Sequence, residues 1–188
     1  LAGLYEPNNG YITYSGLPKG NYKPGSLHSI IGDSLTQEQL FEGTILENIS
    51  MGREKANFEN VKWAVKELGL EEFIKKQANG YNSMLYPMGK NLPRSIVRKL
   101  LLARSIADKP KLLLLEEAFE HLEETDRRSI IDFLTREENQ WTLVAVSSDP
   151  YLAKACNQII IMKEGTISDS GDYSKLKGHL NQKLNDHA

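Results

Sequence analysis

The stretch that most constrains the fold is KLLLLEE, Lys111 to Glu117, in which four leucines run directly into two glutamates. Lys109-Pro110 supplies a turn signal just before it, and such a bounded apolar run is typical of a strand buried on both faces of a parallel sheet. Paired carboxylates at the end of such a strand have two explanations. They form a metal-binding or catalytic strand end, or they begin an acidic, solvated helix. The surrounding sequence is needed to choose between them.

The segments that flank this run alternate between helix and strand. SIVRKLLLARSIAD (95–108) and TDRRSIIDFLTREENQ (125–140) have the apolar spacing of amphipathic helices, and WTLVAVSS (141–148) has the composition of a second buried strand. DPYLAKACN then predicts a short helix, and QIIIMKEGTISDSGD (158–172) predicts a hairpin turning at Lys163-Glu164-Gly165. The alternation predicts an α/β fold around a parallel sheet.

The first half of the chain divides differently. GYITYSG (10–16) and LHSIIGDS (27–34) are predicted strands, whereas FENVKWAVKELGLEEFIKKQANG (58–80) has helical spacing and glycine stop signals. We therefore predict one domain in three parts. These are a β-rich lobe and loop at 1–56, a helical subdomain at 57–105, and a core at 106–188.

Composition excludes several classes of protein. With 188 residues, 40% hydrophobic and 26% charged, the chain can bury the core of one globular domain. Lys plus Arg number 23 against 25 Asp plus Glu, so the net charge of −2 offers no general attraction to nucleic acid, and no nucleic-acid partner is predicted. No apolar run approaches the roughly 18 residues of a membrane span. The sequence starts without a methionine and within a pattern, so we expect a fragment lacking an N-terminal part.

Several separated phrases occur in a characteristic order. They are LAGLYEPNNGYITYSG (1–16), LFEGTILENI (40–49), GYNSMLYPMGKNLPRSIVRKLLLARSIADKPKLLLLEE (80–117) and NQIIIMKEGTISDSGDYSKL (157–176). Together they resemble the nucleotide-binding domain of ATP-binding cassette (ABC) transporters of the exporter type, over nearly the whole chain. The resemblance implies the P-loop NTPase (ABC ATPase) fold, with ATP and Mg²⁺ as cofactors of the parent family.

The resemblance also implies a function and partners. In the parent protein the domain would couple ATP binding and hydrolysis to transmembrane transport. Its expected partners are a transmembrane domain, docked near the loop before LFEG and the helical subdomain, and a second nucleotide-binding domain in a head-to-tail dimer. The implied location is cytoplasmic, at the inner face of the cell membrane.

By the same resemblance, KLLLLEE is the Walker B strand. Glu117 occupies the position of the catalytic carboxylate and is the predicted general base. Glu116 occupies the position of the aspartate that orders the water around Mg²⁺. Because glutamate is one methylene longer and Mg²⁺ requires tight octahedral geometry, this metal role needs a backbone shift or an intervening water.

Other nucleotide-contacting positions depart from the family. Where the family signature reads LSGGQ, this chain has LPRSI (92–96), which puts Pro93, Arg94 and Ser95 at predicted cofactor-binding positions. Pro93 has no N–H group, whereas Arg94 can pair with a phosphate, although a solvated arginine at a helix start is the more ordinary interpretation.

Three further positions complete the predicted site. Glu123 keeps the acid of the D-loop, and Ser148 stands at the position of the switch histidine as a predicted catalytic residue. Counting back from Leu40-Phe41, the position of the family's Q-loop glutamine falls on Thr36. Gln37, one residue later, is therefore a candidate for metal and cofactor binding. The four histidines are scattered and are interpreted as surface or packing residues.

No GxxxxGK(S/T) phosphate-binding loop occurs in residues 1–188, and in the family it lies just before the position of Leu1. Two hypotheses follow. The chain is the greater part of a transporter's nucleotide-binding domain, or it is a degenerate, catalytically inactive half that serves as a binding or scaffolding partner in an ABC dimer. A third, an ABC-type ATPase acting on nucleic acid or in translation, is disfavoured by the exporter-like LFEGTILENI and the balanced charge.

We expect residues 1–188 to bind no ATP saturably, because phosphoryl-transfer sites depend on the combined positioning of several groups. Isothermal titration calorimetry with Mg-ATP measures this directly. A dissociation constant in the micromolar range would contradict the expectation.

Overall fold

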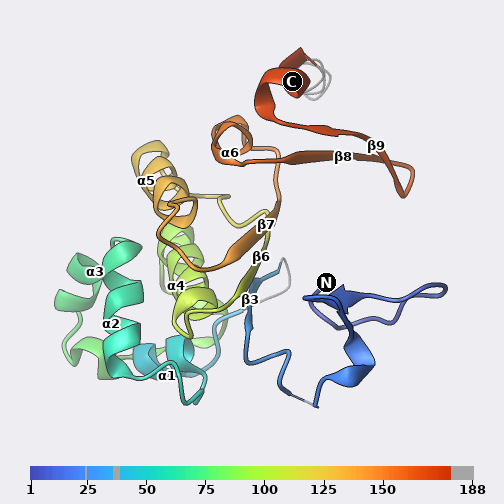
Figure 1. Ribbon diagram of the computed structural model, residues 1–188. Helices are drawn as coiled ribbons and strands as arrows, with labels where there is room; N and C mark the ends of the chain where they lie inside the picture. The colour runs from blue at the N-terminus through green and yellow to red at the C-terminus, as the bar shows by residue number, and fades with distance from the viewer. Residues whose placement is uncertain (24, 36–38, 179–188) are drawn as a thin grey trace.

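The computed structural model describes residues 1–23, 25–35 and 39–178 (Figure 1). Its strands are β1 (Thr13–Tyr14), β2 (Leu17–Pro18), β3 (Ile31–Ser34), β4 (Gly43–Thr44), β5 (Met84–Leu85), β6 (Leu112–Glu116), β7 (Thr142–Val146), β8 (Ile159–Lys163) and β9 (Thr166–Gly171). Its α-helices are α1 (Ile45–Ser50), α2 (Phe58–Glu67), α3 (Glu71–Lys75), α4 (Arg94–Ile106), α5 (Glu124–Leu134) and α6 (Pro150–Ala155), and three short 3₁₀ helices are η1 (Lys19–Asn21), η2 (Gly80–Asn82) and η3 (Pro87–Gly89). None of the described helices is long and apolar enough to cross a membrane.

A three-stranded parallel sheet in the order β3-β6-β7 forms the centre of the molecule. Strand β6 pairs with β3 on one side and with β7 on the other, with Leu113 opposite Gly32 and Leu143. Leu113, Leu114 and Leu115 are all buried, so the prediction of a strand covered on both faces is confirmed. The α/β prediction is also confirmed.

Helix α4 packs directly against β3, and Gly32 makes this contact possible. A Cβ atom at Gly32 would lie 2.0 Å from the backbone oxygen of Ser105, closer than any real contact. The glycine therefore lets helix and sheet approach at backbone distance. This approach places the start of α4 near the carboxyl ends of the strands.

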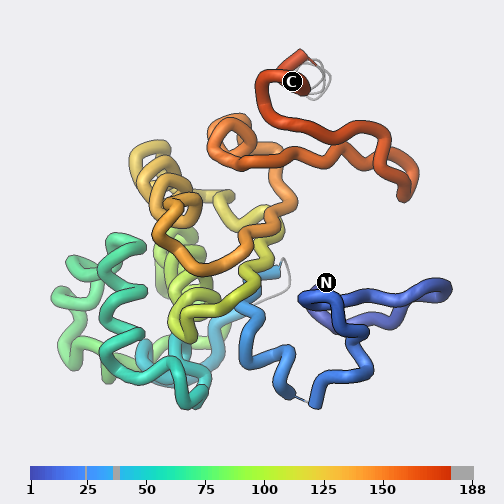
Figure 2. Tube along the Cα trace, viewed as in Figure 1, coloured from blue at the N-terminus to red at the C-terminus, as the bar shows by residue number. Residues whose placement is uncertain are grey.

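The helical part, α1 to α4, lies on one side of the sheet, whereas the β1–β2 and β8–β9 hairpins extend on the other (Figure 2). Buried Arg104 of α4 ties the helical part together. Its guanidinium donates hydrogen bonds to the backbone oxygens of Asn48 (2.8 Å) and Gln39 (3.1 Å), while Arg53 donates to the backbone oxygen of Arg104 (2.6 Å). The loop entering α1 is thus fixed to the helix that follows the altered signature.

Strand β7 differs from its prediction as a buried strand. Its residues alternate between exposed and half-buried, and Val146 is 63% exposed. Apolar residues of β8 and β9 are open as well, including Met162 at 61%. The physical reason is that β7 lies at an edge of the parallel sheet, and the described residues leave one of its faces uncovered.

The three parts predicted from the sequence pack together into one structure. Strand β3, from the 1–56 part, pairs with β6 of the 106–188 part. A single cluster of buried apolar side chains runs from Ile45 and Val61 through Leu100 to Ile131. Packing therefore connects the parts, and the boundaries at 56 and 105 stay predictions.

We expect Leu113→Ala to lower the free energy of unfolding by about 2 to 5 kcal/mol, because Leu113 is fully buried and its truncation leaves a cavity. Val144→Ala on neighbouring β7 serves as the matched control, since Val144 is partly exposed. Urea unfolding followed by circular dichroism measures both. Equal losses for the two variants would contradict the central position of Leu113.

Candidate functional site

The ends of β6 and β7 bring predicted site residues together. Glu116 is the last residue of β6 and lies in register with Val146, the last residue of β7. The backbone N–H of Glu117 donates to the backbone oxygen of Val146 at 2.9 Å. Because parallel strands end at one edge of a sheet, Glu116, Glu117 and the segment containing Ser148 share that edge. Ser148 itself is exposed.

The chain turns sharply at Glu117, whose φ of 44° lies in the left-handed region that is uncommon for residues other than glycine. The pKa of the Glu117 carboxyl is raised above its usual value by burial first, and then by repulsion from Glu120 and Glu116. A raised pKa makes a carboxylate a stronger base. The geometry and charge at Glu117 therefore suit a proton acceptor better than an ordinary surface glutamate.

A partly buried ion pair fixes the segment after β7. Asp149 caps α6 by accepting hydrogen bonds from the N–H groups of Tyr151 (2.7 Å) and Leu152 (3.1 Å), and it pairs with Arg127 of α5 at 2.6 Å. The Asp149 N–H donates to the hydroxyl of Ser147 at 3.1 Å. Ser148 is thus held between a strand end and an anchored cap.

The altered signature forms the start of α4. Pro93 is the N-cap residue and makes no side-chain cap, and Arg94 is the first helical residue. Pro93 and Arg94 are exposed, and Ser95 is half-buried. Gly89, with a φ of 63°, allows the preceding turn to pack close, because a Cβ there would lie 2.6 Å from Cγ2 of Val97.

A cavity of about 300 Å³ opens beside this helix start. Three cationic side chains and a histidine line it: Lys90, Arg94, Arg98 and His121. We call this set the basic pocket. Of its members only Arg94 was predicted as a site residue. Arg94 and Arg98 are four residues apart on α4, a spacing that places both side chains on one side of the helix and that is visible in the sequence. Lys90 precedes the helix, as the C-cap residue of η3, so its place in the pocket comes from the turn before α4.

The basic pocket and the strand end are neighbours. Arg98 of α4 approaches Glu120 at 3.9 Å, and His121 follows Glu120 directly. Glu123, the predicted D-loop acid, is the N-cap residue of α5, is exposed and makes no side-chain cap. The segment 117–123 therefore runs from Glu117 at the strand end to the basic pocket that contains Arg94. Gln37 lies outside the described residues.

The residues at this edge of the sheet supply only part of what Mg²⁺ and ATP require. Within residues 1–23, 25–35 and 39–178, no group of three His, Cys, Asp or Glu side chains could hold a metal ion. Glu116 and Glu117 alone do not supply the octahedral oxygen set that Mg²⁺ requires. For a phosphate, Pro93 lacks the N–H that a helix N-terminus ordinarily offers. The described residues therefore do not build a complete site for Mg²⁺ or ATP.

The chain is similar in sequence to ATP-binding proteins of ABC transporters. No family model matches the sequence. ABC transporter B family member 14 of Arabidopsis thaliana is 28% identical over 173 residues, 92% of this chain and 14% of that protein. The uncharacterized ABC transporter ATP-binding protein YfiC of Bacillus subtilis (strain 168) is 30% identical over 176 residues, 94% of this chain and 29% of that protein. The chain therefore spans less than a third of the length of these relatives.

A solved structure has the same fold. It is the structure of a bacterial Atm1-family ABC exporter with ATP bound, which superimposes with a TM-score of 0.89 at 22% identity. The superposition covers 100% of this chain and 33% of that one. The P-loop NTPase (ABC ATPase) fold predicted from the sequence is confirmed.

We expect Glu120→Gln to lower the pKa of Glu117, because it removes one of the negative charges that oppose ionisation there. The carboxyl ¹³C resonance of Glu117, followed by NMR through an acid titration, measures the change. Glu124→Gln is the control and should leave the midpoint unmoved, since Glu124 does not contribute to the raised pKa. A midpoint at the ordinary glutamate value in the unmodified chain would contradict the assignment.

Proposed function

From the premise that this chain is related to the ATP-binding proteins of ABC transporters and has the fold of an ABC exporter, we propose that it is the nucleotide-binding domain of an exporter-like transporter. In the parent protein it couples ATP binding and hydrolysis to transport across a membrane. It acts at the cytoplasmic, inner face of that membrane, where ATP is supplied.

The observation that carries this proposal is the position of Glu117. It follows the central buried strand, its backbone is fixed to β7, and its raised pKa makes it a good acceptor for the proton of an attacking water. Glu116, the last residue of β6, is the residue that we propose lies nearest Mg²⁺ in the parent protein. In the parent protein, ATP would supply the reacting phosphate and Mg²⁺ would neutralise its charge, with Glu116 and Glu117 as this chain's part of the site.

A transmembrane partner has a suitable surface on the helical side. Phe41, Met84, Tyr86 and Met88 are all exposed. They are neighbours, because β4 pairs with β5 and the Met88 N–H donates to the backbone oxygen of Leu40 at 2.7 Å. Exposed apolar patches of this kind mark protein contacts. We propose that this patch contacts the transmembrane domain and that the altered signature faces a second nucleotide-binding domain.

A second function is supported by a separate observation. Pro93, Arg94 and Ser148 all depart from what the family uses around the γ-phosphate, whereas the fold is intact. A domain changed in this way would contribute an interface to an ABC dimer without hydrolysing ATP itself. The two functions differ in the role of Glu117.

Steady-state Mg-ATP hydrolysis by the full-length parent protein decides between them. If Glu117 is the general base, Glu117→Gln lowers the rate roughly 10²- to 10⁴-fold, because a positioned base contributes about that much. Glu124→Gln, an exposed acid nearby on α5, should leave the rate unchanged. Equal background rates for the unmodified parent and Glu117→Gln would reject the catalytic function and favour the inactive half.

A further inference from the structure

One face of the molecule carries opposite charges side by side. The basic pocket of Lys90, Arg94, Arg98 and His121 opens beside α4. Next to it, the segment 117–123 carries Glu117, Glu120 and Glu123. Arg98 and Glu120 lie where the basic pocket meets this acidic segment, with Nη2 of Arg98 3.9 Å from Oε2 of Glu120.

Two of the three cations of the pocket have no anionic partner in the part of the chain that the structure describes. Among the described residues, Lys90 and Arg94 have no ion pair. Arg98 has only the Glu120 contact, at the long end of the range for an ion pair. Lys99, the next residue, contrasts with them, because it pairs with Asp126 at 2.6 Å. The pocket therefore has positive charge available for an anionic group.

The chemistry of the pocket comes from side chains. Pro93 removes an N–H from the start of α4, and Arg94 and Ser95 add side chains there. Arginine presents a planar fork of N–H donors that matches a carboxylate in two parallel hydrogen bonds. A carboxylate presented by another protein surface can therefore enter the open pocket without close approach to the backbone.

We propose that the basic pocket binds carboxylates of a second copy of this domain, supplied by the 117–123 segment of that copy. The proposal rests on the pairing of two nucleotide-binding domains proposed above and names the contact that holds the pair. In a two-fold pair the same surface meets itself, so each basic pocket faces the acidic segment of the other copy. A face with adjacent basic and acidic halves is complementary to itself in this arrangement.

The acidic half also gains from such a contact. Glu117, Glu120 and Glu123 lie close together in the 117–123 segment, so cations of a second copy would reduce the repulsion among these carboxylates. Pairing through charge does not require a nucleotide. It is weakened by salt, because screening lowers the attraction between partly exposed charges.

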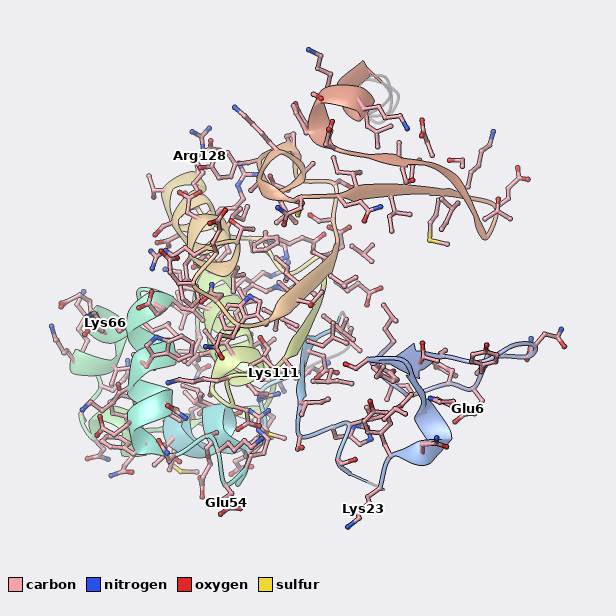
Figure 3. The ribbon with its side chains drawn as sticks, viewed as in Figure 1. Glu6, Lys23, Glu54, Lys66, Lys111 and Arg128 are labelled. Atoms are coloured by element: carbon pink, nitrogen blue, oxygen red, sulfur yellow. The ribbon has the colours of Figure 1, made fainter. Side chains whose placement is uncertain are left out.

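Sedimentation equilibrium of the 188-residue chain tests the contact. We expect self-association that weakens at least tenfold between about 0.05 M and 0.5 M NaCl, since the Debye length shortens over this range. Arg94→Glu should weaken association at least tenfold at low salt. Lys66→Glu is the matched charge reversal, on an exposed position of α2 in the helical part (Figure 3), and should have no effect.

A charge exchange makes the test specific. Arg94→Glu and Glu120→Lys should each abolish pairing with their own kind, because like charges then meet at both contacts. Mixed together, the two variants should pair again, because both contacts regain opposite charges. Both substitutions are at exposed positions, and an unchanged thermal midpoint by circular dichroism shows that the variants fold.

Two outcomes would overturn the inference. A chain that stays monomeric at all concentrations has no such contact. A pair whose association changes with neither salt nor the two charge reversals is held by other surfaces, such as the exposed apolar residues of β7 and β8. The domain would then pair, but not through the basic pocket. Neither outcome touches the ATPase measurement on the parent, so failure here is distinguishable from failure of the proposed transport function.

Discussion

Pairing of β6 on both edges and burial of both its faces is the constraint on which the rest of the structure depends. Leu113 and Leu115 are buried, and the strand is hydrogen-bonded to β3 and β7 along its length. A strand fixed in this way cannot slide, because a shift of one residue would exchange its two faces. Its end therefore sets where Glu116 and Glu117 lie and where the segment 117–123 begins.

A second network connects the helical part to this frame. Arg104 holds the backbone on both sides of Phe41, through Gln39 and Asn48, and its guanidinium lies 5.8 Å from the Phe41 ring. The same helix begins at Arg94 and packs on β3 through Gly32. The proposed transmembrane contact and the altered signature are therefore joined by one rigid element. A buried arginine that satisfies several carbonyl groups is costly to disturb, which keeps this geometry fixed.

The fold and the side chains of the site depend on different parts of the sequence. The backbone around Glu117 has the arrangement of an exporter-type domain, since the turn depends on strand pairing and not on the identity of its side chains. The surface beside it carries the cationic side chains of Lys90, Arg94 and Arg98. Those cations suit carboxylates as well as phosphates, because both anions offer oxygens to arginine. One fold can therefore carry different side chains, and different contacts, at the same site.

The sequence by itself determined the α/β class, the buried strand of Leu113, Leu114 and Leu115 and the place of Glu117 directly after that strand, because apolar periodicity and motif order are local properties of the chain. It predicted β7 as buried, which was wrong, because exposure depends on what covers an edge strand. It also missed Lys90, Arg98 and His121 as one pocket. His121 is distant from α4 in the chain, and only the packing of α4 on the sheet brings the turn after β6 beside it. Tertiary structure alone decided that cluster, since contacts between segments far apart in sequence leave no periodic signal.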